Sequence, residues 1–95
     1  MLHTDIKAVV TQNLFLNHGL RTQISVADLI TGQNGVAVRI DATTPIDAEQ
    51  KDAIITDLNH DFGASASDRF QVVKAPEHEF FPDSDQSLTL EIISR

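Results

Sequence analysis

The period of the apolar residues changes along the chain, and this change constrains the fold more than any other feature of the sequence. Two segments have helical spacing, with Ile6, Val9, Val10 and Leu14 in one and Ala48, Ile54, Ile55, Leu58 and Phe62 in the other. Each is followed by two strand-like runs, at 24–31 and 36–41 and then at 70–73 and 88–93. The order α-β-β-α-β-β predicts an α+β two-layer sandwich, with two helices packed on one face of a four-stranded, mainly antiparallel sheet.

Glycines mark the expected ends of both helices. Gly19 can take the left-handed conformation that stops a helix, and Leu20 can then fold back onto the last turn. Gly63 is the corresponding stop for the second helix. The start of that helix has two candidates, Thr44 followed by a proline and Asp47 followed three residues later by a glutamine, and the sequence leaves both open.

The first two strands flank the sequence TGQNG, which suggests a hairpin with two possible registers. A two-residue turn at positions 34–35 would place Asp28 opposite Asp41, which is unfavourable. A four-residue loop at 32–35 would instead place Asp28 opposite Arg39 and Leu29 opposite Val38. We prefer the second register because it pairs opposite charges and brings apolar residues together.

The preferred register predicts a surplus of apolar residues on the first strand. Ile24, Val26 and Ile30 would point away from the face that carries the other apolar residues of the hairpin. Either a bulge after Val26 resets the phase, or another chain covers this strip. The strip therefore predicts a partner-binding surface, and the most direct partner is a second copy of the chain in a homodimer.

Composition and charge argue against several classes of function. The chain has 95 residues, which we expect to form one domain, 1–95, and it has no cysteine, so disulfides and thiolate metal sites are excluded. Its net charge is −7, and residues 41–95 hold twelve of its 14 acids, so we expect neither nucleic acid nor an anionic membrane as a partner. No apolar run approaches the about 20 residues of a membrane span, and the first residues lack a signal-peptide pattern, so we expect a cytoplasmic protein.

Motifs for metal binding and catalysis are weak. Glu77 and Glu79 flank His78, but neighbouring residues of a strand point to opposite sides and cannot converge on one ion. The run DSDQSLTLE begins like a calcium loop, yet Leu88 stands where glycine is needed and Ser94 where the bidentate glutamate is needed. No nucleophile elbow or phosphate-binding loop occurs. We therefore expect no metal, no cofactor and no enzymatic activity.

The segment PEHEFFPDSD, at 76–85, is the second candidate for partner binding. One ring of Phe80 or Phe81 could anchor another protein, and Glu77 and Glu79 would favour a basic one. The leading hypothesis is a non-enzymatic interaction or assembly module that self-associates. One alternative is an acidic inhibitor or regulator that presents the second helix and the 77–85 loop to a basic partner. Another is a small-ligand or metal-binding domain that uses His60, His78 and nearby carboxylates.

Overall fold

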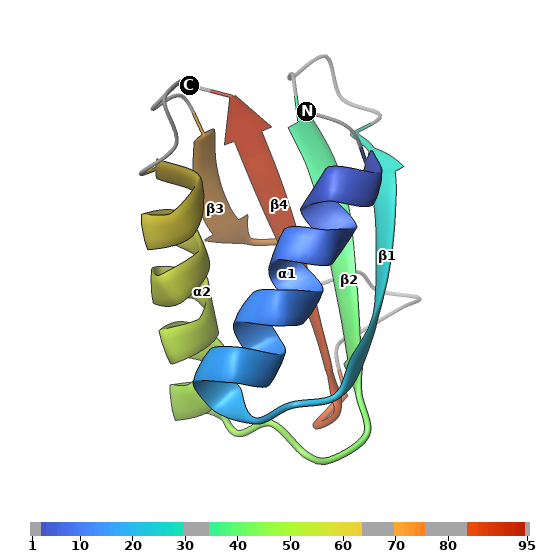
Figure 1. The fold of residues 1–95 in the computed structure, drawn as a ribbon, viewed down its shortest axis with the longest axis vertical. Coiled ribbons are helices and arrows are strands. Elements are labelled where there is room, and N and C mark those ends of the chain that lie inside the picture. The colour runs from blue at the N-terminus through green and yellow to red at the C-terminus, as the bar shows by residue number, and fades with distance from the viewer. Residues whose placement is uncertain (1–2, 30–34, 64–69, 76–83, 95) are drawn as a thin grey trace.

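The computed structural model describes residues 3–29, 35–63, 70–75 and 84–94. Its elements, in chain order, are α1 (His3–His18), β1 (Thr22–Asp28), β2 (Gly35–Ala42), α2 (Ala48–Gly63), β3 (Phe70–Lys74) and β4 (Ser87–Ser94). All strand pairs are antiparallel, and the strand order is β1-β2-β4-β3. Both helices lie on one face of the sheet, α1 crossing in front of β2 and β4 next to β1, and α2 beside β3 (Figure 1). The predicted α+β class and element order are confirmed.

The core lies between the helices and the sheet. The two central strands each contribute three alternating buried residues, Val36, Val38 and Ile40 from β2 and Leu88, Leu90 and Ile92 from β4. The helices supply Ile6, Val10, Leu14, Ile54, Leu58 and Phe62. Val9 is 39% exposed and Ala48 is exposed, so these two residues with helical spacing do not face the core. Ile46, in the connection before α2, is buried and adds to the core.

Both predicted registers of the first hairpin are wrong. The structure pairs Ile24 with Ile40, Val26 with Val38 and Asp28 with Val36, and the Leu29 amide donates to the Gly35 carbonyl at 3.2 Å. An exposed ion pair contributes only about 0–1 kcal/mol, whereas burying one valine or isoleucine side chain contributes about 1.5–3 kcal/mol. The register that places Ile24 and Val26 beneath α1 therefore prevails over the one that pairs Asp28 with Arg39, and no bulge is needed.

The helix ends follow local rules. Gly19 has φ of 64°, its amide donates to the Phe15 carbonyl at 3.1 Å, and Leu20 is buried behind it, which confirms the predicted stop. At the start of α2, the Asp47 carboxylate accepts a hydrogen bond from the Gln50 amide at 2.7 Å. Asp47 is thus the N-cap, and of the two candidates it is the correct one. Neither described helix has the length and apolar content needed to cross a membrane.

Candidate functional site: the open edge of strand β1

The strand order leaves β1 and β3 as the two edges of the sheet. In an antiparallel pair, alternate residues direct their backbone groups toward the neighbouring strand and the residues between them direct theirs away. Two hydrogen bonds fix this alternation in β1, from the Leu29 amide to Gly35 and from the Thr43 amide to Arg21. The outward-directed backbone groups of β1 therefore belong to Thr22, Ile24, Val26 and Asp28.

The middle of the β3 edge is closed by a side chain of α2. The Asn59 side-chain amide donates to the Val72 carbonyl at 2.6 Å, and its oxygen accepts from the Val72 amide at 2.7 Å. These two bonds replace the pair that a further strand would make with Val72. Lys74 adds an exposed positive charge at the end of the same strand, a common protection against edge-to-edge pairing.

The β1 edge has no such protection within the described part of the chain. No hydrogen bond from another described residue reaches the outward backbone groups of β1. The strand, TQISVAD, contains neither proline nor lysine, and its single charge, Asp28, lies at its end. There the carboxylate contacts His3 Nε2 at 2.8 Å, an exposed pair that involves only side chains. An unprotected edge of this kind is a template for another strand.

An open groove of about 790 Å³ runs between α1 and β1. We call it the β1 groove; its lining includes Lys7, Ala8, Thr11 and Phe15 from α1 and Thr22 and Ile24 from β1. Phe15 is 54% exposed, an unusual state for a large aromatic side chain. The Thr22 hydroxyl is buried and makes no hydrogen bond within the described chain. The groove thus combines an apolar wall with a polar atom that has no partner.

The sequence pointed to β1 for a reason that the structure overturns. Ile24 is 5% exposed and Val26 is half-buried against the core, so they do not form the predicted second apolar face. What β1 offers instead is its backbone, which the side-chain pattern does not reveal. The remaining predicted partner-binding residues lie outside the described residues: Ile30, Glu77, Glu79, Phe80 and Phe81.

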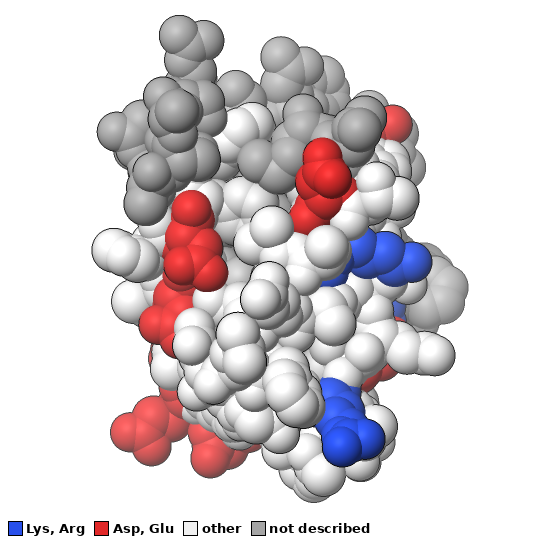
Figure 2. Space-filling view, viewed as in Figure 1, with Lys and Arg blue, Asp and Glu red and all other residues white. Residues whose placement is uncertain are grey.

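The charges are unevenly spread over the surface. Figure 2 shows acidic side chains gathered along α2 and basic ones on the flank where α1 meets β1. Two of the α2 acids contact α1: Asp61 accepts from the Asn13 side-chain amide at 2.6 Å, and Asp57 lies 2.8 Å from His18 Nε2. The second contact is within ion-pair distance but lacks hydrogen-bond geometry. These carboxylates therefore help to join the helices.

His18 and His60 lie in the last turns of α1 and α2, where a protonated imidazole would interact favourably with the helix dipole. Within the residues that the structure describes, no three histidine or acidic side chains gather as metal ligands would. His78, the other histidine of the small-ligand hypothesis, lies outside those residues. His18 and His60 are thus accounted for by their positions in the helices.

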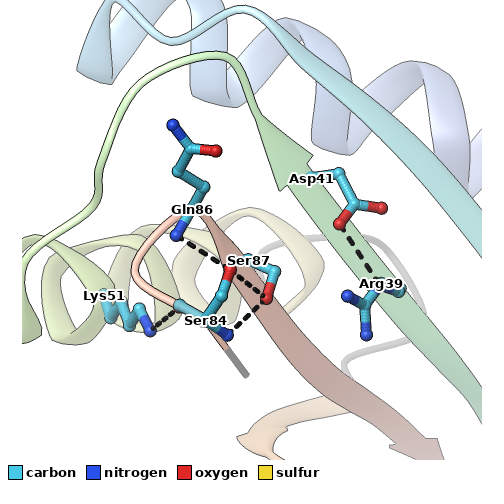
Figure 3. A network of polar contacts seen from close by, with 6 residues as sticks. All are labelled: Arg39, Asp41, Lys51, Ser84, Gln86 and Ser87. Atoms are coloured by element: carbon cyan, nitrogen blue, oxygen red, sulfur yellow. Dashed lines mark hydrogen bonds and ion pairs between the residues drawn. The ribbon is translucent and has the colours of Figure 1, made fainter. Parts of the chain in front are cut away.

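Two serines form a compact turn before β4 (Figure 3). The Ser87 hydroxyl accepts from the Ser84 amide at 2.8 Å, and the Ser84 hydroxyl accepts from the Gln86 amide at 3.1 Å. The Lys51 ammonium donates to the Ser84 carbonyl at 3.1 Å rather than to a hydroxyl. Both serine hydroxyls are thus held by the turn itself, as expected for a structural motif rather than an activated nucleophile.

No protein-family model matches this chain, no curated protein matches its sequence, and no solved structure matches its fold.

Proposed function

We propose that this protein is a non-enzymatic interaction module that binds an extended polypeptide strand along β1. One observation carries the proposal: the outward backbone groups of Thr22, Ile24, Val26 and Asp28 are unpaired among the described residues, whereas the middle residue of the opposite edge, Val72, is paired with Asn59. Addition of a strand to a sheet edge is a common mode of peptide recognition, in which backbone hydrogen bonds give affinity and alternate side chains give specificity.

The β1 groove supplies the specificity in this proposal. Every second side chain of an added strand would point toward the helix layer and enter the groove. There it would meet Phe15 and Ala8, which favour an apolar side chain. At the Thr22 end of β1 it would meet the Thr22 hydroxyl, which favours a polar side chain. The side chains between them would face solvent on the opposite face of the sheet, as Ser25 of β1 does.

A peptide that copies residues 21–29 of the chain is a suitable probe. Added to the isotope-labelled protein carrying Ser25→Lys, which weakens competing pairing between copies, it should shift the amide resonances of β1 and of the groove face of α1. Those of β3, at 70–74, should stay in place. N-methylation of the peptide at Ile24 and Val26 removes the backbone N–H donors of these two residues. N-methylation at Gln23 and Ser25 removes the N–H donors that point to the opposite side of the strand. One of these two peptides should lose binding and the other should retain it, because only one of the two groups of donors faces β1 of the protein.

Shifts that spread over both edges, or equal binding by the two N-methylated peptides, would contradict strand addition. Absence of any shift at millimolar peptide would contradict it as well.

The acidic-regulator alternative has less support. Asp47 caps α2, and Asp57 and Asp61 contact α1, so these acids have roles within the fold. The 77–83 part of the proposed acidic loop lies outside the described residues. A basic partner for α2 stays a prediction, and binding that is insensitive to salt would count against it.

A further inference from the structure

We infer that the strand bound at this edge is β1 of a second copy, paired antiparallel about a two-fold axis that passes beside Ser25. The inference rests on the proposed function and names its partner. Three features support it: the self-complementary sequence of β1, the distribution of charge, and the fit of β1 side chains to the β1 groove.

The first feature is the pairing itself. With the axis beside Ser25, all seven residues of β1 are matched by those of the other copy. Ile24 then lies opposite Val26 of the second copy, and Thr22 lies opposite Asp28, so no two like charges meet. The four outward residues of each strand would exchange about eight backbone hydrogen bonds.

Other registers are poorer. An axis at Val26 would place Ile24 opposite Asp28, which sets an apolar side chain against a carboxylate. An axis at Ile24 would leave Asp28 opposite residue 20, and Leu20 is buried behind the end of α1. The Ser25 register is the one that uses the whole strand.

The second feature is charge. A chain with net charge −7 resists self-association unless its acids lie away from the interface. Residues 1–40, which include α1 and β1, hold only Asp5 and Asp28 as acids against the bases Lys7, Arg21 and Arg39. The acid-rich α2 lies on the other side of the molecule (Figures 1 and 2). Two copies that meet through β1 therefore keep their acidic sides apart.

The third feature is the fit to the groove. In the proposed dimer, Val26 of the second copy, which is half-buried in one copy alone, points toward the helix layer and lies opposite Ile24, which lines the β1 groove. Its burial at the interface would extend an apolar layer that also includes the exposed ring of Phe15. Ala8 and Thr11, which line the same groove, have small side chains. Each copy thus completes an apolar layer that the other leaves open.

A disulfide test reports the register directly. The chain has no cysteine, so Ser25→Cys introduces a single thiol on the exposed face of β1. At the axis, the two Cα atoms of a non-hydrogen-bonded pair would lie about 4.5 Å apart, within the range of a disulfide. Gln23→Cys is the matched control, because its two copies would be offset by four residues, or about 14 Å along the strand. Oxidation should give a covalent dimer rapidly with Ser25→Cys and slowly with Gln23→Cys, and equal rates would overturn the register.

Sedimentation equilibrium tests the dimer without a covalent bond. The unmodified chain should dimerise at micromolar concentration. Ser25→Lys, which sets two ammonium groups against each other at the axis, should weaken dimerisation at least about tenfold. Gln71→Lys makes the same change of charge at an exposed position of β3 and should leave the dimer intact. A dimer that both variants leave unchanged would show that the interface lies elsewhere and overturn the inference.

The outcomes also separate the inference from the proposed function. A strict monomer that binds the 21–29 peptide at β1 would overturn the inference and leave strand recognition in place, with a different protein as the partner. A monomer that binds no peptide would overturn both.

Discussion

Replacement of Asn59 by alanine tests whether the closed β3 edge is a structural requirement. Asn59→Ala removes both hydrogen bonds to Val72, at 2.6 and 2.7 Å, and each is worth about 1 kcal/mol net. Val72 is 1% exposed, so water replaces the lost partners poorly and the cost rises. Alanine has a higher helix propensity than asparagine, and this difference stabilises the variant by about 0.5 kcal/mol. We therefore expect a loss of about 2–3 kcal/mol from a total stability of about 5–14 kcal/mol for a chain of this size.

Urea unfolding followed by far-ultraviolet circular dichroism measures this loss as a lower midpoint with an unchanged slope. Thr56→Ala is the matched control, because Thr56 is exposed on the same helix and, among the described residues, its hydroxyl bonds only to the Asp52 carbonyl. It should change the free energy of unfolding by less than about 0.5 kcal/mol. Hydrogen exchange adds a local measure, since the Val72 amide should lose protection in the Asn59 variant. A loss below about 0.5 kcal/mol, or an equally protected Val72 amide, would refute the reasoning.

Substitutions at three further positions test the fold, each by the same urea assay. Gly35→Ala should lower the free energy of unfolding by about 1–3 kcal/mol, because the added Cβ would lie 2.5 Å from the Ile92 carbonyl oxygen, a backbone atom that cannot move aside. An unchanged urea midpoint would contradict this close approach. Gly19→Ala should cost about 1 kcal/mol, since Gly19 has φ of 64° with open space around it, and Gly19→Asn should cost less than Gly19→Ala. Asp47→Ala should cost about 1 kcal/mol through loss of the cap on the Gln50 amide, whereas Asp47→Ser should retain most of the stability; equal losses in the two variants would argue against capping.

The element order and the helix ends could be predicted because they depend on local physics. Gly19 and Asp47 act within one turn of their own helices, so the neighbouring sequence suffices to identify Gly19 and to limit the N-cap of α2 to two candidates, Thr44 and Asp47. The hairpin register could not be predicted in the same way. Opposite charges at Asp28 and Arg39 suggested one pairing, but the burial of Ile24 and Val26 beneath α1, a tertiary effect, decides another.

The candidate site could not be predicted from the sequence, for a different reason. It depends on strand order, since β1 is an edge only because β4 pairs with β2. Had the second hairpin paired with β1 instead, β2 would have become the edge and the β1 groove would not exist. Alternation of apolar residues shows which face of a strand is buried, but it does not show which neighbour the strand has. The role of Asn59 was missed likewise, because a single polar residue on a helix carries no signal of a distant backbone partner.

The contrast between the two edges limits the size of any assembly built by strand pairing. A subunit with two reactive ends polymerises without limit, whereas a subunit with one reactive end stops growing once two have joined. If two copies pair through β1, as we infer, Asn59 leaves the middle of β3 unavailable to a further strand, and the assembly would stop at two subunits. A single side-chain amide on α2 would then separate a closed pair of subunits from an open-ended fibre.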